Sequence, residues 1–327
     1  MPLIGSAILA VSLILATPLA VEAQQAGKVW RIGFLSGGTA AAAKPAVEQF
    51  RQGLRELDYV EGQNITIEYR WADGQLERLP QLATDLARLG TDLIVAVASQ
   101  AALATRDATT SIPIVMVFVG DPIYLGLATS LSRPGKNVTG LTSFGPELAG
   151  KQLSLLKEVV PRVKRIAVLK NPGNPLTPQW MLGVEAAART LDLQLQLLSV
   201  TRADDVAPAF RDAMKGRAGA MFVASDQVVG LQAAQISALA LSNRLPTISG
   251  ARALMEAGGL MTYSIDGLAL YRRAASYVHK ILKGARPGEL PIEEPTKFRL
   301  IINLKTAKAL GLTIPQSLLV RADEIIQ

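Results

Sequence analysis

The chain has 327 residues, of which 49% are hydrophobic and 19% charged, a balance typical of a folded protein with sizeable cores and room for two domains. It contains no cysteine and one histidine, His279, which excludes disulfide bonds, cysteine nucleophiles, cysteine-ligated metals and paired-histidine metal sites. Its net charge of +7 comes from scattered Lys and Arg residues among few aromatic residues, which predicts a solvated basic surface and no nucleic-acid partner.

The first 23 residues have the pattern of a secretory signal peptide. An apolar run over residues 7–19 precedes small residues at Val21 and Ala23, which suit a signal peptidase, and it is shorter than the roughly 20 residues of a membrane-spanning helix. No Lys or Arg precedes Lys28, so the usual basic segment is missing; a start codon further upstream or a plain N-terminal anchor is the alternative. We expect cleavage near Ala23 and a periplasmic protein without a lipid anchor.

Short β-branched strands alternate with amphipathic helices in the first half of the mature chain. The pattern predicts strands over residues 31–35, 64–69, 92–98 and 114–119, with helices over 47–57, 76–89 and 99–108 between them. Such alternation is typical of βαβ units that build a parallel sheet.

The same alternation returns after residue 164. Strands are predicted over residues 165–169, 194–199, 219–224 and 246–249, and helices over 177–191, 204–214 and 229–243. The chain is therefore expected to form two Rossmann-like α/β lobes with parallel sheets.

Other segments are predicted to connect these lobes. The turn-rich stretch 133–142 leads to a helix over 147–160, a second helix covers 268–282, and a strand over 297–303, a helix over 304–310 and residues 318–320 complete the second lobe. We expect one lobe from residues 28–143 and 264–292 and the other from 144–263 and 293–327. A chain that passes between lobes more than once can hinge.

Candidate ligand-binding residues follow from the expected topology. In doubly wound sheets a ligand binds beyond the carboxyl ends of the strands, beside helix N-termini with free N–H groups. Together with the aromatic side chain after the strand predicted at 260–262, this rule selects Ser36, Ser99, Gln100, Asp121, Asn171, Asn174, Asp226 and Tyr263. The serine hydroxyls suit a ligand carboxylate, and Asp121 or Asp226 suits a ligand ammonium group.

Each candidate also has a structural interpretation. Ser99 and Asp226 can act as helix N-caps, Asp121 can shape a turn before Pro122, the two asparagines lie in a turn-rich stretch, and Tyr263 can pack in a core. Residues 33–38 lack the glycine spacing of a dinucleotide site, and we expect no cofactor and no metal.

Several segments together resemble one known family. They are residues 50–57 followed by 59–65, then 112–115, Gly120-Asp121-Pro122, 133–140 and 302–315. In this order they resemble the substrate-binding proteins of ABC transporters in the family associated with tryptophan and tyrosine. The resemblance covers residues 28–326 and implies a type I periplasmic-binding fold whose two hinged lobes close over a small ligand without catalysis.

These observations predict an extracytoplasmic solute-binding component of an ABC importer that captures a small amino-acid-like or carboxylate ligand and works as a monomer. The chain has no Walker motif, so the permease and the ATPase are expected to be separate chains. One alternative is a binding protein that senses a ligand for a membrane receptor. Another is an exported α/β enzyme, which the lack of a nucleophile elbow and of a histidine partner disfavours. The residues leave the identity of the ligand open.

Overall fold

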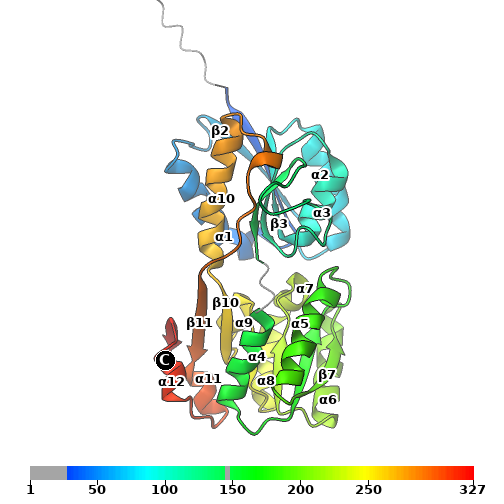
Figure 1. The fold of residues 1–327 in the computed structure, drawn as a ribbon, viewed down its shortest axis with the longest axis vertical. Coiled ribbons are helices and arrows are strands. Elements are labelled where there is room, and N and C mark those ends of the chain that lie inside the picture. The colour runs from blue at the N-terminus through cyan, green and yellow to red at the C-terminus, as the bar shows by residue number, and fades with distance from the viewer. Residues whose placement is uncertain (1–27, 144–147) are drawn as a thin grey trace, which may run out of the picture.

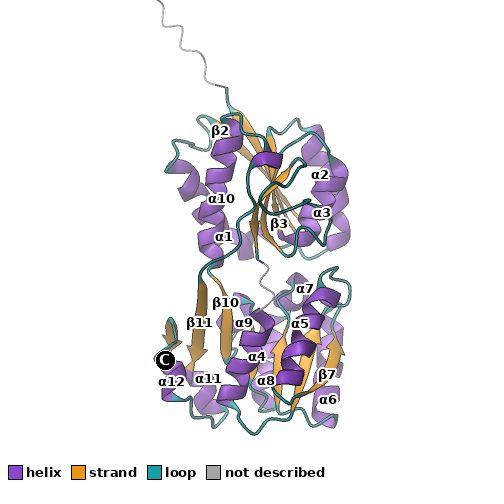
Figure 2. Ribbon diagram, in the orientation of Figure 1, coloured by secondary structure: helices purple, strands orange, loops and turns teal. Residues whose placement is uncertain are grey.

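Two β-sheets, one above the other along the long axis of the molecule, organise the chain (Figure 1). The computed structural model describes residues 28–143 and 148–327, so the expected signal peptide and the first residue of the helix expected at 147 lie outside the described residues. Helices cover both faces of each sheet, and the α/β fold with two mainly parallel sheets is confirmed (Figure 2). None of the helices in the described ranges is long and apolar enough to cross a membrane.

The first sheet is fully parallel, with the strand order β2-β1-β3-β4-β5. Its central strands read as continuous apolar runs because helices cover both of their faces. Its strands are β1 (Trp30–Ser36), β2 (Ile65–Trp71), β3 (Leu93–Val97), β4 (Ile114–Val119) and β5 (Val138–Thr142). Its helices are α1 (Ala40–Arg55), α2 (Leu79–Arg88), α3 (Ala98–Ala108) and, from much later in the chain, α10 (Gly267–Leu282), with 3₁₀ turns at Leu76–Arg78 and Pro287–Glu289.

The alternation of side chains along a strand divides the core of this lobe. Phe34 of β1 packs with Phe50 of α1 and Tyr277 of α10 on one face of the sheet. Leu35, the next residue, faces Leu86 of α2 on the other face. The carboxyl end of β1 therefore lies between two apolar layers, one on each face of the sheet.

The second sheet has the order β12-β11-β10-β9-β8-β6-β7 and is parallel except for the antiparallel pair β10 and β11. Its strands are β6 (Arg165–Lys170), β7 (Gln194–Ser199), β8 (Ala220–Val223), β9 (Thr247–Ser249), β10 (Met261–Ile265), β11 (Phe298–Asn303) and β12 (Glu324–Ile326). Its helices are α4 (Leu148–Val159), α5 (Thr177–Thr190), α6 (Val206–Lys215), α7 (Gln227–Leu231), α8 (Ala233–Ser242), α9 (Arg252–Glu256), α11 (Leu304–Ala309) and α12 (Gln316–Leu319), with a 3₁₀ turn at Ala203–Asp205.

The chain passes from one lobe to the other after Ser143, after β10 and before β11 (Figure 1). Two of these passages differ slightly from the expected boundaries. β10 continues in the second sheet as far as Ile265, and Glu293 still pairs with the first sheet, since its N–H donates to Gly140 O at 3.0 Å and its carbonyl accepts from Thr142 N at 3.0 Å.

Two predicted elements were wrong in detail, and two short elements were missed. The helix expected over 229–243 is two helices, α7 and α8, which meet at Gln232. The strand expected to reach Ala98 ends at Val97, because Ala98 adopts a φ of 68° that an extended strand does not allow. The short edge strand β12 and the helix α9 were not predicted, since neither is long enough to show a period.

Gly53 allows α1 and α10 to approach each other at backbone distance. A Cβ at this position would lie 2.5 Å from the carbonyl oxygen of Arg272 and 2.9 Å from Ala275 Cβ. Glycine at position 53 therefore allows α10, which comes much later in the chain, to pack closely against α1 in the first lobe.

Replacing Gly53 with alanine is expected to lower the free energy of unfolding by about 1–3 kcal/mol, because the two helices must separate to admit the methyl group. Gly230→Ala is the control, since its added Cβ meets no atom within 4 Å and lies in a helix, where alanine is favoured. Urea unfolding followed by circular dichroism measures both variants, and equal midpoints would contradict this packing argument.

Candidate functional site

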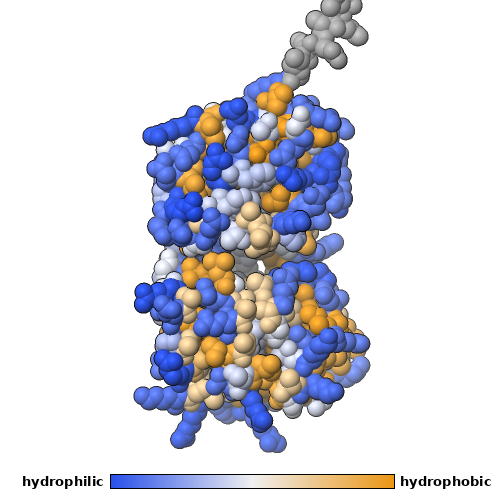
Figure 3. Space-filling view, turned by 180° about the vertical axis from the view of Figure 1, so that it is seen from behind, coloured by the Kyte–Doolittle hydropathy of each residue, from blue (hydrophilic) through white to orange (hydrophobic). Residues whose placement is uncertain are grey.

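The carboxyl ends of strands from both sheets face each other across the middle of the molecule and enclose two adjoining cavities of about 350 and 430 Å³. Figure 3 shows the boundary between the lobes from behind, with apolar side chains along it. We call the larger of the two cavities the hinge cavity, because residues 264–268, where β10 ends and α10 begins, line it. We call the smaller one the α5 cavity, because residues 176–183 line it. Both are lined by Gly120, Ser143, Leu148, Asn174, Leu176, Ser225 and Asp226.

The hinge cavity combines an aromatic pair with charged groups. Phe118 and Tyr271 have ring centroids 6.0 Å apart. Burial raises the pKa of Tyr271 well above its ordinary value. Arg252 and Arg299 also line the cavity, and each is paired within its own lobe, with Glu256 at 2.7 Å and Glu324 at 3.2 Å respectively.

Strained backbone lies at this cavity. Ala98 and Phe118, at the carboxyl ends of β3 and β4, have φ angles of 68° and 62°. Side chains other than glycine adopt such angles only at a cost of about 1–3 kcal/mol, and strained residues of this kind cluster at functional sites. Phe118 is held in place from the other side, since a Cβ at Gly267 would come within 2.5 Å of its ring.

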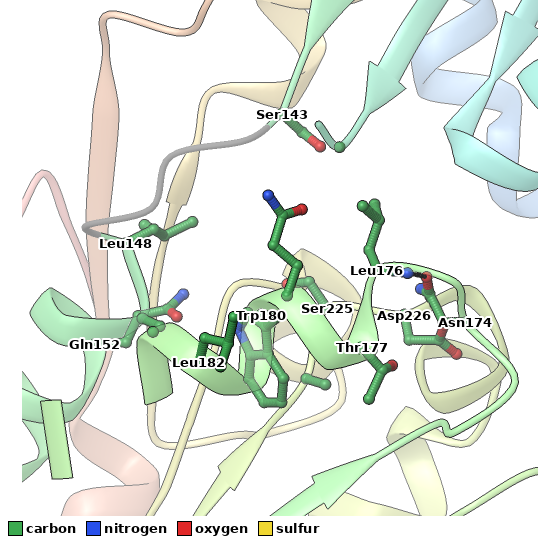
Figure 4. Close-up of a pocket in the computed structure, with 15 residues that line it drawn as sticks. Ser143, Leu148, Gln152, Asn174, Leu176, Thr177, Trp180, Leu182, Ser225 and Asp226 are labelled. Atoms are coloured by element: carbon green, nitrogen blue, oxygen red, sulfur yellow. Dashed lines mark hydrogen bonds between the residues drawn. The ribbon is translucent and has the colours of Figure 1, made fainter. Parts of the chain in front are cut away.

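The α5 cavity is mainly apolar and uncharged except for Asp226. Its apolar lining includes Leu148, Leu182 and Trp180, which Figure 4 shows around the cavity. Trp180 is fixed by the ring of Phe222, at a centroid distance of 5.1 Å. This cavity therefore suits an uncharged, largely apolar group.

Asp226 is a buried carboxylate held rigidly between the two cavities. It is 9% exposed and caps α7, where its Oδ1 accepts from Val228 N at 2.8 Å and Val229 N at 3.1 Å. Asn171 Nδ2 donates to Oδ1 at 3.2 Å, and Asn174 Nδ2 donates to Oδ2 at 2.8 Å. No Lys or Arg of the described ranges forms an ion pair with it, so its negative charge is available to a cation in the cleft.

Four of the predicted site residues line these cavities. Ser99, Gln100, Asn174 and Asp226 border the hinge cavity, and the latter two also border the α5 cavity. The alternative role of Asp226 as an N-cap is confirmed, but that of Ser99 is wrong, because its Oγ accepts from Gly120 N at 3.1 Å and joins the ends of β3 and β4.

Ser36, Asp121, Asn171 and Tyr263 do not line either cavity. The Oγ of Ser36 accepts from Gly38 N at 3.2 Å within its own loop, and Asn171 orients Asp226. The ring of Tyr263 stacks on Phe298 at 5.7 Å. Asp121 shapes the turn expected of it, through bonds from Ile123 N and Tyr124 N, and also bonds across the lobes.

Several cavity residues were not among the predicted site residues. Phe118 lies inside a strand, Tyr271, Gln152 and Trp180 lie on helices, and Arg299 lies on the antiparallel strand β11. The rule of strand ends finds only the loops that follow parallel strands. Phe118, Tyr271 and Trp180 could have been chosen as candidate ligand contacts because aromatic residues are only 5% of the chain.

The two lobes touch along the edge of the cleft away from the hinge. Gln179 Nε2 of α5 donates to Asp121 Oδ2 of the first lobe at 2.7 Å. Nearby, a Cβ at Gly120 would overlap Leu176, one at Gly37 would overlap Gln227, and one at Gly74 would lie 2.7 Å from Leu231 Cδ1. We call this set of contacts the rim, and it describes lobes that are closed on each other.

The two α/β lobes, with a polar cleft at their strand ends, have the fold of type I periplasmic-binding proteins. Residues 35–326 match the model of the family described as ABC transporter substrate binding protein, and the chain belongs to this family. The family is one of binding proteins that serve ABC transporters and not a family of enzymes.

Relatives agree with this assignment. A tyrosine-binding protein of Clostridioides difficile is 27% identical over 267 residues, which cover 82% of this chain and 76% of that protein. An ABC domain from Streptococcus pneumonia in complex with L-Trp is 27% identical, covers 91% of this chain and 100% of its own, and superposes with a TM-score of 0.85.

Another solved structure is similar over the same share of the chain. A substrate-binding protein with adhesive properties from Clostridium difficile, in a ligand-free, open structure, is 25% identical, with 91% of this chain and 100% of that chain covered, but its TM-score is 0.69. The similarity to the L-Trp complex is greater at nearly the same identity. In the structure described here, the rim contacts hold the two lobes against each other on that side of the cleft.

Replacing Asp226 with alanine is expected to lower the free energy of unfolding by about 1–3 kcal/mol, because α7 loses its cap and the two asparagine amides lose their acceptor. Asp204→Ala is the matched control, since Asp204 is exposed and accepts no hydrogen bond from the described part of the chain. Chemical denaturation measures both, and a loss below 0.5 kcal/mol for Asp226→Ala, a bound of about the size of a surface substitution, would contradict the role given to this carboxylate.

Proposed function

We propose that the chain binds an aromatic amino acid, tryptophan or tyrosine, between its lobes and delivers it to the permease of an ABC importer. The observation that carries this proposal is the buried carboxylate of Asp226, which has no basic partner in the described ranges and lies between an aromatic pair and an apolar cavity. The relatives named for tyrosine and solved with L-Trp support the ligand class.

The two ends of an amino acid differ in charge, and the cleft offers a complement to each. The ammonium group would donate to Asp226 in charge-assisted hydrogen bonds. The carboxylate would face the side of the hinge cavity that holds Arg252 and Arg299, with the hydroxyl of Ser225 beside it. The aromatic ring would occupy apolar surface that is otherwise exposed to water inside the cleft.

Binding is expected to favour the closed form. The ligand would touch Ser99 and Phe118 of the first lobe and Asp226 of the second at the same time, and only the closed arrangement makes both sets of contacts. The permease can then recognise the loaded protein by its closed shape. The permease and the ATPase would be separate chains.

The site of action follows from the same proposal. Binding proteins of ABC importers work outside the cytoplasm, and we propose that this one is exported to the periplasm, is cleaved near Ala23 and acts as a monomer without catalytic activity. Its ligand would diffuse in from the surrounding medium and not be made or altered in the cleft.

Purified protein is expected to bind L-tryptophan or L-tyrosine with one site per chain, measured by isothermal titration calorimetry. A ligand at 100 times its Kd would add about 2.7 kcal/mol to the free energy of unfolding, visible as a rise in melting temperature. Binding of a sugar or of leucine, with no response to any aromatic amino acid, would refute the proposed ligand class.

The rim provides a test of closure. Gly120→Ala is expected to weaken binding by about tenfold, because its methyl group overlaps Leu176 only when the lobes are closed. The double variant Gly120→Ala, Leu176→Ala removes the obstruction and is expected to recover most of the affinity, whereas Leu176→Ala alone controls for the lost side chain. The same loss of affinity in the double variant as in Gly120→Ala would show that closure is not what the glycine serves.

A further inference from the structure

Gln152 of α4 is a buried amide in the wall of the α5 cavity. Its side chain belongs to a residue that is 3% exposed, and its Nε2 donates to the carbonyl oxygen of Tyr263 on β10 at 2.7 Å. Figure 4 shows Gln152 on the same side of the cavity as Leu148. The residue thus joins a helix and a strand of the second lobe at the point where both border the cleft.

This bond fixes which atom the amide offers to a ligand. A carbonyl can only accept, so the nitrogen must face Tyr263 and the oxygen is left over. No N–H or O–H group of residues 28–143 or 148–327 donates to Gln152 Oε1. The space beside the nitrogen is closed as well, because a Cβ at Gly250 would lie 3.0 Å from Nε2.

The other polar groups of the α5 cavity are already engaged or enclosed. Thr177 donates its hydroxyl to Asn171 O at 2.5 Å, and both ends of the Asn174 amide are bonded. The amide oxygen of Gln179 also has no hydrogen-bond partner among the described residues, but it is buried from solvent. Ser225 lies where the two cavities meet. Among the described residues, Gln152 Oε1 is therefore the unpaired acceptor that remains accessible in the apolar part of the α5 cavity.

We infer that Gln152 Oε1 determines which aromatic ring the cleft accepts. This inference rests on the proposed function. The side chain of the ligand would lie in the α5 cavity among Leu148, Trp180 and Leu182. There the indole N–H of tryptophan or the phenol O–H of tyrosine donates to Gln152 Oε1. Phenylalanine has a similar shape but no donor, and it would leave this buried acceptor unpaired.

The test compares the dissociation constants of L-tryptophan, L-tyrosine and L-phenylalanine by calorimetry, for the unaltered protein and for Gln152→Leu. The unaltered protein is expected to bind tryptophan or tyrosine about tenfold more tightly than phenylalanine, or better. In Gln152→Leu this preference is expected to fall to about threefold or less, through weaker binding of the ligands with a donor and unchanged binding of phenylalanine.

Gln196→Leu is the matched control. Gln196 on β7 also donates its Nε2 to a backbone carbonyl, Asp212 O, at 2.6 Å and has an amide oxygen without a partner among the described residues, but it lines neither cavity. Its replacement is expected to leave the ligand preference unchanged. Equal weakening of the binding of all three ligands in Gln152→Leu would overturn the inference. It would show that Gln152 has only a structural role, through its hydrogen bond to Tyr263 O.

A change in the ligand tests the same point without any variant. In 3-(3-benzothienyl)-L-alanine a sulfur replaces the indole N–H, and the unaltered protein is expected to bind it about tenfold more weakly than tryptophan. Equal affinity for the two would overturn the role of Gln152 while the proposed function stands. Failure of every aromatic amino acid to bind would instead refute the proposed function itself.

Discussion

Close approach of the backbone of the first lobe to side chains of the second lobe is the constraint on which the cleft depends. The first lobe meets the second at Gly37, Gly74 and Gly120, and at each of these positions a Cβ would run into a side chain of the other lobe. Glycine therefore does more here than permit a turn, because Gly37 and Gly120 have ordinary φ angles and are needed for the space they leave. With larger residues at these positions, the side chains of Gln227, Leu231 and Leu176 would have to move before the strand ends could come as near to each other.

A second requirement is a fixed charge in the cleft. A carboxylate that is buried without a counter-charge is expensive, and Asp226 is tolerated because a helix N-terminus and two asparagine amides donate to it. Those donors stabilise the negative charge without neutralising it. A ligand ammonium group can therefore form an ion pair whose geometry is set before it arrives, so little ordering of the protein opposes binding.

The sequence was sufficient to predict the two-lobed fold and part of the lining of the cleft. Strand and helix periods differ enough to be read from residues 31–249, and the carboxyl ends of parallel strands lead directly to Ser99, Asn174 and Asp226. Tyr271 and Gln152 could not be found in this way, since a helical residue reaches the cleft only if its helix is turned toward it. That orientation depends on packing, for example of α10 on α1, and on the passages between lobes.

A crystal structure of the protein with L-tryptophan tests the central claim most directly, because it shows whether one small molecule bridges both lobes. The account predicts closed lobes, an ammonium nitrogen within hydrogen-bonding distance of Asp226, and contacts to residues of the first lobe such as Ser99 or Phe118. A tryptophan held by one lobe alone, with Asp226 bonded only to its present donors, would contradict it.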